Sequence, residues 1–254
     1  MEPPFDSFTE TGLQCSIFDR TITLYRIWSY AMTICKERFY QMWKRIDARG
    51  KASVVWQEIE QHYGQAHRAY HNLFHIHHCL NQLELVWQEV SDPYLISWAL
   101  FFHDYFYDIP SNSNEWRSAL ASMRIAYYAQ LPHEFRTASG ILVFATKNHK
   151  IIETPHVAQK DIALLLDIDL VILGTPWEQY DQIFRRAIRK EYGSIPWEQY
   201  AEKRTKILEQ FLERDKLYSH PFFHEHYGQQ AGSNLKREIE LLQTKNEEVC
   251  YAEN

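Results

Sequence analysis

The sequence predicts an all-α fold of about ten helices, and three observations favour this class. Glycine is scarce, with 8 in 254 residues, which is roughly 3% against a usual value of about 7%. Strand turns and nucleotide-binding loops need glycine for unusual backbone angles or close backbone approach, so its scarcity favours helices. No alternation of apolar and polar residues is long enough to predict a strand. Prolines stand where helices would begin.

Proline starts three of the predicted helices. Pro93, Pro176 and Pro196 each precede an apolar-periodic run, and the first helical position tolerates proline because its N–H has no partner there. With boundaries good to about two to four residues, the helices are predicted, in order, over residues 20–46, 53–67, 70–90, 93–107, 113–130, 133–147, 159–172, 176–192, 197–214 and 229–246.

The domain organisation follows from the absence of any long linker between these helices. Residues 1–50 are predicted to form an N-terminal helical extension packed on a main domain over residues 51–250. The pentapeptide PWEQY occurs at 176–180 and again at 196–200. Two copies do not make a repeat protein, so we interpret them as two helix starts of similar chemistry.

Charge and cysteine usage exclude several classes of protein. A net charge of −6 and a pI near 6.1 argue against binding nucleic acid polymers, which needs a basic face. Four scattered cysteines without a CxxC pair indicate reduced thiols. No apolar signal segment is visible, and the longest uncharged apolar run, residues 96–102, is too short to span a bilayer. We therefore expect a cytoplasmic protein that binds a small molecule and does not bind a membrane. The sequence leaves open whether the chain forms a homo-oligomer.

Histidines are concentrated in one segment. Six of the 13 lie between positions 62 and 78, where an even spread would place about one. Within a helix, His71, His75 and His78 would share one face, because side chains three and four positions apart lie above each other. Neutral imidazoles on one helix face suit a metal. The remaining histidines of the segment we interpret as ordinary polar residues.

Two further segments place acids inside apolar runs. His103 and Asp104 interrupt the run ALFFHDYFYD, and Asp167 and Asp169 interrupt IALLLDIDLVILG. A buried carboxylate is costly unless it is paired or binds a cation. Asp167 and Asp169 point about 200° apart on a helix, so they cannot both face one site. These acids indicate a metal site to which only one of Asp167 and Asp169 contributes.

The ordered set of segments resembles the HD-domain superfamily of metal-dependent phosphohydrolases. The segments that carry the likeness are YHNLFHIHHCL, FFHDYFYD and LLLDIDLVILG. A bacterial subgroup of predicted HD-type phosphohydrolases is similar over more of the chain, through RAYHN, NEWRSA, TKNH, DIDLVILG and IRKEY. A His-Asp dipeptide alone is a weak signal, whereas the ordered set is specific. The resemblance implies one helical bundle around a central metal.

The resemblance also implies roles for individual residues. His103 and Asp104 match the paired ligands of the family. Asp169 matches the last ligand better than Asp167, because the apolar residues and glycine of that motif follow it. For the first ligand the choice lies between His71 and His75, and the apolar residues after His75 favour it.

Other residues are implied as additional contacts to a second metal or to substrate. His149, in TKNHK, matches a histidine that some members use in this way, and His71 would lie beside the site. Asp167 is the alternative to Asp169 as the last ligand. Several members carry a phosphate-binding lysine soon after His-Asp, but here residues 105–108 read YFYD. The candidates to replace that lysine are Arg68, Lys147, Arg189 and Arg204, of which Arg68 lies nearest to the histidines in sequence.

Two more acids are candidates for moving protons. Glu115 could activate the attacking water as a general base, or it could form a capping box with Asn112, three residues earlier. The sequence leaves both interpretations open. Asp108 follows Asp104 by four residues, so on a helix it would share that face and could serve as a base or a second-metal ligand.

The function implied is metal-dependent hydrolysis of a phosphoester in a nucleotide or another small phosphorylated molecule. Two imidazoles and two carboxylates suit a divalent metal ion such as Mn, Fe, Co, Ni or Mg better than structural zinc. Such a metal would activate water for direct attack at phosphorus, without a covalent enzyme intermediate. Two alternatives remain: a di-iron oxygenase, for which His71 and His149 could supply further ligands, and a non-catalytic binding module stabilised by metal.

Overall fold

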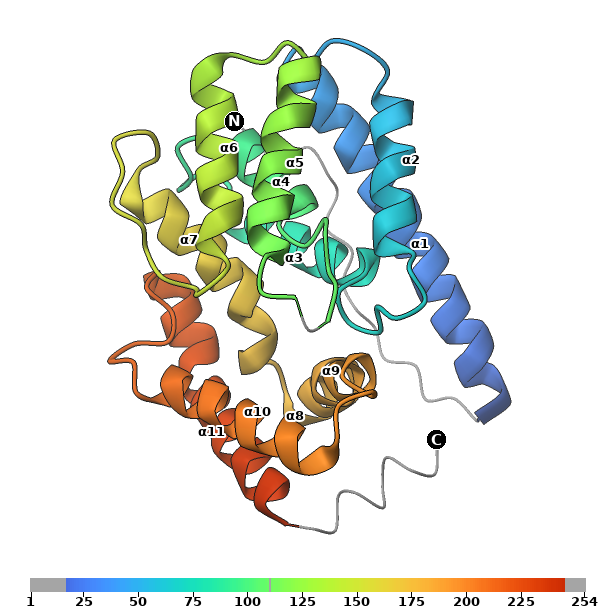
Figure 1. Ribbon diagram of the computed structural model, residues 1–254, viewed down its shortest axis with the longest axis vertical. Coiled ribbons are helices and arrows are strands. Elements are labelled where there is room, and N and C mark those ends of the chain that lie inside the picture. Colours follow the sequence, from blue (N-terminus) through green and yellow to red (C-terminus); the bar gives the residue numbers. More distant parts are fainter. Residues whose placement is uncertain (1–16, 110, 245–254) are drawn as a thin grey trace.

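The computed structural model describes residues 17–109 and 111–244, with side chains from Tyr30 onward. These residues form helices joined by loops, with no strand among them, which confirms the predicted all-α class (Figure 1). The helical elements are α1 (Ile17–Arg45), α2 (Ala52–Tyr63), α3 (Leu73–Leu85), α4 (Pro93–Phe102), α5 (Asn114–Tyr128), α6 (His133–Ala145), α7 (Gln159–Leu170), the 3₁₀ turn η1 (Val171–Gly174), α8 (Trp177–Gln179), the π-helical segment η2 (Tyr180–Arg185), α9 (Arg186–Glu191), α10 (Trp197–Leu212) and α11 (Pro221–Gln243).

Two boundaries near the histidines differ from the sequence prediction. The helix predicted from residue 70 begins at Leu73, because the Asn72 side chain accepts a hydrogen bond from the backbone N–H of Phe74 (2.8 Å) and so caps the helix. His71 therefore precedes α3, and the helical face predicted for His71 and His75 is wrong. The helix predicted to reach residue 107 ends at Phe102, which places His103 and Asp104 in the turn that follows it.

The C-terminal helices also differ in detail. The last helix begins at Pro221 and not near residue 229, and proline at this first position is a start signal that the sequence prediction missed. The single helix predicted over 176–192 is observed as α8, η2 and α9 in direct succession. Its middle turn, η2, is wider than an α-helical turn, and such π segments are frequent at functional sites.

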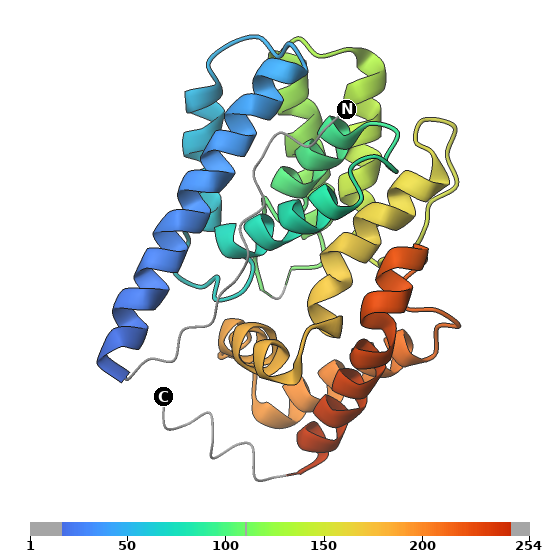
Figure 2. The same cartoon turned by 180° about the vertical axis from the view of Figure 1, so that it is seen from behind.

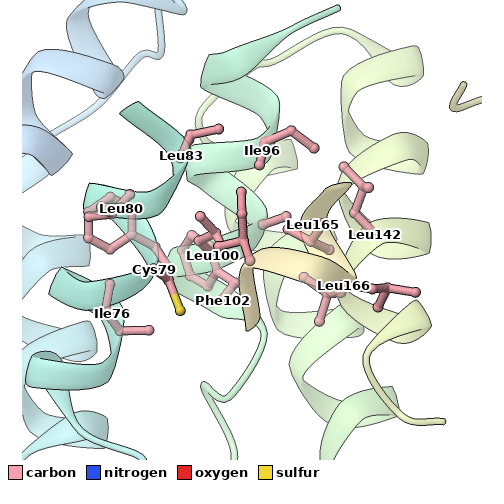
Figure 3. Packing of buried hydrophobic residues seen from close by; sticks show 14 of the residues in the cluster. Ile76, Cys79, Leu80, Leu83, Ile96, Leu100, Phe102, Leu142, Leu165 and Leu166 are labelled. Carbon is pink, nitrogen blue, oxygen red and sulfur yellow. The ribbon is translucent and has the colours of Figure 1, made fainter. Parts of the chain in front are cut away.

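Helix α4 lies at the centre of the core. It contacts α1, α3, α5, α6 and α7, and every residue from Ile96 to Phe102 is buried. A helix covered on all sides must be apolar on all sides, which explains the uncharged run in this segment. Figure 3 shows Leu100 and Phe102 of α4 among Cys79 and Leu80 of α3 and Leu165 of α7. Each fully buried leucine contributes roughly 1.5–3 kcal/mol.

The remaining helices surround this centre in two groups. Helix α1 packs against α2, α3 and α4, while α5 and α6 form an antiparallel pair beside α4. Helices α8 to α11 form the other end of the molecule, and α11 joins it to the core by packing against η1 (Figure 2). No helix in the described part of the chain is both long and apolar enough to cross a membrane.

The cysteines do not pair within the described residues. Cys35 and Cys79 are buried as free thiols, and burial raises the pKa of Cys35 to about 12, so it stays protonated. Cys15 and Cys250, which were also expected to be reduced, lie outside the described residues.

Candidate metal centre

Three helices bring two histidines and an aspartate to one point in the core. His75 lies on the first turns of α3, His103 follows the last residue of α4, and Asp169 is near the end of α7. One donor atom from each of the three lies within 4.8 Å of the other two. Both histidines are 2% exposed, so this set of ligand atoms is enclosed by protein.

The donor atoms face one another. His75 Nε2 is 3.1 Å from His103 Nε2 and 3.1 Å from Asp169 Oδ1. The distance from His103 Nε2 to the same carboxylate oxygen is 3.4 Å. Asp104 joins from the turn after α4, with its Oδ2 3.0 Å from His103 Nε2 and 3.8 Å from His75 Nε2. Four side chains expected to be ligands therefore converge on one point.

A backbone contact orients the imidazole of His103. Its Nδ1 donates to the carbonyl of Leu100 (2.8 Å), which directs Nε2 toward the centre. An outer contact of this kind sets the tautomer and direction of a metal-binding histidine. The Cys79 sulfur lies 3.7 Å from both ring nitrogens of His75 and therefore packs on that ring without selecting a nitrogen.

The electrostatics of the cluster call for a central cation. Burial lowers the pKa of His75. Burial also acts against protonation of His103, but the Asp104 and Asp169 carboxylates outweigh it and raise the pKa of this imidazole well above its usual value. Two imidazolium groups 3.1 Å apart would repel, which is consistent with pKa shifts of opposite direction for the two histidines. The histidines and Asp169 present the donor atoms that could hold a metal ion at this point.

The structure separates the two acids of α7. Asp169 Oδ1 faces His75 and His103, and its Oδ2 lies 3.0 Å from His149 Nε2. Asp167 instead accepts hydrogen bonds from the backbone N–H groups of Ser219 (3.0 Å) and His220 (2.6 Å), just before α11. The backbone of His149 has a φ of +46°. This left-handed conformation is uncommon for residues other than glycine, and it is found at functional sites.

A large cavity of about 1080 Å³ borders the four converging side chains (His75, His103, Asp104 and Asp169), the candidate metal-ligand cluster. Asp104 and Asp169 are among the residues that line it, and residues of α9 and α10 line it as well. Among the residues predicted as site candidates, the ones that line this cavity are His71, Asp104, Asp108, Glu115, Lys147, His149, Asp169 and Arg204. The volume is sufficient for a ligand of nucleotide size or larger.

The acids of the cavity differ in their surroundings. Glu115 is half-buried near the start of α5, and burial raises its pKa. Asp108 is exposed and pairs with Arg117, and its hydrogen bond to that guanidinium lowers its pKa. Lys147 is exposed at the rim, with its ammonium 5.9 Å from the ring of Phe144. The Glu115 side chain is therefore the better suited of the two acids to take up a proton.

Arg68 does not line the cavity, because its guanidinium is used elsewhere. It donates to the carbonyls of Asp104 (2.6 Å) and Tyr105 (2.9 Å) and is itself buried. These are carbonyls left free after the end of α4, so Arg68 acts as a cap for that turn. Arg189 likewise donates to the carbonyls of Tyr192 and Ile195, whereas Arg204 lines the cavity and pairs with buried Glu238 (2.8 Å).

Sequence reasoning missed Glu191, at the end of α9. Its Oε1 accepts from the backbone N–H groups of Tyr70 (2.7 Å) and His71 (2.9 Å). Its Oε2 lies 2.7 Å from His71 Nδ1 and accepts from the Tyr107 hydroxyl at 2.9 Å. The signal available in the sequence was its position within the segment IRKEY. The local pattern of residues 186–191 does not reveal partners 120 residues away.

No known family, curated protein or solved structure matches this chain.

Proposed function

We propose that the protein is a metal-dependent phosphohydrolase that cleaves a phosphoester of a small phosphorylated molecule with water as the nucleophile. The observation that carries the proposal is the convergence of His75, His103 and Asp169 beside a large cavity, which Asp169 lines. Such an arrangement gives an enclosed ligand set with one open side, as a catalytic metal needs.

The residues present fit a divalent cation. His75, His103 and Asp169 would hold it, and Asp104 is close enough to His103 (3.0 Å) to join them. Two imidazole nitrogens and two carboxylates are donors that Mn, Fe, Co, Ni or Mg accept. When bound, such a metal would polarise a phosphoryl oxygen and lower the pKa of water.

The side chains of the cavity supply the rest of the chemistry. Glu115 would take a proton from the attacking water, because burial raises its pKa above that of an ordinary carboxyl group and makes it a stronger base. Phosphate charge would be met by cations along the cavity; these are Lys147, Lys150, Lys203, Arg204 and Arg214. They belong to two separate segments, residues 147–150 and 203–214, which supports a substrate that is charged at more than one point, as nucleotides are.

The test is phosphate release from a panel of nucleotides and sugar phosphates by chelated protein to which one metal is returned at a time. We expect hydrolysis with Mg²⁺ or Mn²⁺, at equal rates with and without dioxygen, because water activation does not change the oxidation state of the metal. Asp169→Asn should reduce the rate by orders of magnitude, with Asp167→Asn as the matched control. Turnover that needs iron and dioxygen would instead establish an oxygenase.

A further inference from the structure

The imidazole of His71 is held in one orientation at the edge of the proposed site. Its ring stacks on that of Tyr107, with 4.1 Å between centroids and 28° between planes. Tyr70 meets it edge-on at 5.0 Å, and the ring of His75 lies 6.0 Å away. His71 lies outside the metal-ligand cluster itself but adjoins one of its members.

Glu191 determines which nitrogen of His71 faces the cavity. The side chain of Glu191 is 0% exposed, and its Oε2 lies 2.7 Å from His71 Nδ1. A buried carboxylate accepts hydrogen bonds, so Nδ1 carries the proton in this contact. His71 lines the cavity, and its Nε2 has no hydrogen-bond partner in the described part of the chain. The unused nitrogen is therefore available to a ligand.

A purely structural role would not need this second contact. The backbone N–H groups of Tyr70 and His71 already bind Glu191 Oε1, which fixes the loop before α3. The bond through Oε2 adds nothing to the backbone, but it orients the imidazole and increases its basicity, as a carboxylate does for a catalytic histidine.

We propose that His71 is a catalytic residue that contacts the reacting phosphoryl group and protonates the leaving oxygen, with Glu191 as its positioning residue. This proposal rests on the proposed phosphohydrolase function. Water oxygen bonds to phosphorus as the bond from phosphorus to the leaving oxygen breaks. The Nε2 proton of the His71 imidazolium passes to the leaving oxygen, and the proton that Glu115 takes from the attacking water returns to the imidazole through solvent. The products are an alcohol and inorganic phosphate.

The leaving group distinguishes acid catalysis from a structural contribution. Phenyl phosphate has a leaving oxygen that needs a proton, whereas p-nitrophenolate leaves readily without one. We expect His71→Asn to lower kcat for phenyl phosphate by about 10²–10⁴-fold and to change kcat for p-nitrophenyl phosphate far less. Glu191→Gln should show the same selectivity to a smaller degree. His156→Asn, at an exposed histidine outside the cavity lining, should show no selectivity. Equal losses on both esters would overturn the acid role.

A second measurement does not depend on turnover. In protein labelled with ¹⁵N at histidine and loaded with diamagnetic Mg²⁺, inorganic phosphate should shift the His71 Nε2 resonance. The shift should be reduced in Glu191→Gln, because the imidazole is no longer oriented. If the unmodified protein releases phosphate neither from these esters nor from the panel of nucleotides and sugar phosphates, the proposed function fails, and a phosphate-dependent Nε2 shift would still support the contact. An unchanged Nε2 resonance would refute the contact in either case.

Discussion

Asp167 and Asp169 are separated by one residue, but they have different partners. Asp169 lies with His75 and His103, and Asp167 binds the backbone before α11. A helical rotation of about 100° per residue puts the two side chains on opposite faces, so the helix itself requires this division. One acid is available for a cation, and the other holds a neighbouring element.

We predict that substitution of these two acids has opposite consequences. Asp169→Asn should lose most of the bound metal, because it removes a charged ligand, while the fold remains. Asp167→Asn should keep the metal but lose about 1–3 kcal/mol of unfolding free energy, since the amide oxygen can accept from only one of the two backbone N–H groups and the amide NH2 faces the other. Metal analysis and urea denaturation on both variants test this. A larger metal loss from Asp167→Asn would reverse the assignment.

His149 combines an uncommon backbone conformation with a contact to the centre. Its φ is +46° and its Nε2 is 3.0 Å from Asp169 Oδ2. For a residue with a Cβ this conformation costs roughly 1–2 kcal/mol. Such a cost persists where the side chain has a function.

We therefore predict that His149→Gly separates stability from activity. The metal-free variant should unfold within about 1 kcal/mol of the unmodified protein, because glycine adopts positive φ without strain. Its hydrolytic rate should fall at least tenfold, since Asp169 loses a hydrogen-bonding partner. Denaturation with chelator present and a phosphate-release assay give the two values. Unchanged activity would show that the imidazole is not used.

At the scale of single helices, α3 carries histidines on more than the metal-facing side. His78 Nε2 is buried without a hydrogen-bond partner among the described residues. Burial, with smaller contributions from the charges of His75 and His77, lowers the pKa of His78 to about 4. Between about pH 4 and pH 6.5, His78 is therefore neutral in the folded state. In the unfolded chain its pKa is near 6.5, so it is protonated over the same pH range.

We predict that this histidine makes the fold sensitive to acid. As the pH falls below 6.5, the unfolded chain binds a proton that the folded chain excludes, so stability decreases until about pH 4. The loss amounts to up to about 3 kcal/mol. His78→Gln should reduce the decrease in unfolding free energy between these pH values, measured by urea denaturation with chelator present. The same substitution at exposed His156 is the control, and equal pH profiles for His78→Gln and the unmodified protein would contradict the prediction.

At the scale of the whole molecule, one buried network holds the C-terminal helices together. Glu238 of α11, with a side chain 0% exposed, pairs with Arg204 of α10 at 2.8 Å. The Tyr180 hydroxyl, at the start of η2, donates to the same carboxylate. Because Arg204 also lines the cavity, the network supports the part of the cavity wall that α10 forms.

We predict that Glu238→Ala destabilises the protein by about 3–5 kcal/mol, because it leaves the Arg204 charge buried and unpaired. Activity should fall as well, since the cavity wall depends on the same contacts. Glu202→Ala, which breaks the exposed pair of Glu202 and Lys206 on α10, should have little effect. Urea denaturation compares the two variants. Similar losses from both would show that the buried network does not hold the wall.

The sequence by itself determined the helical class and the residues for which burial needs an explanation. Few glycines and apolar runs of helical period specify helices and their buried faces, and most predicted helices lie within a few residues of the observed ones. Asp104 and the pair of Asp167 and Asp169 were identifiable because a carboxylate inside an apolar run is costly without a cation, but this argument did not choose between the two acids of the pair. That Asp167 and Asp169 must diverge followed from helix geometry alone.

Only the tertiary structure decided which of these residues meet. A hydrophobic period specifies which face of a helix is buried, but it does not specify which helix lies opposite. His71 lies before α3 because Asn72 caps that helix. The Arg68 guanidinium does not line the cavity and instead donates to carbonyls 36 and 37 residues away. Glu191 reaches His71 across 120 residues. Such contacts depend on packing between helices distant in the chain, so local sequence carries no signal of them.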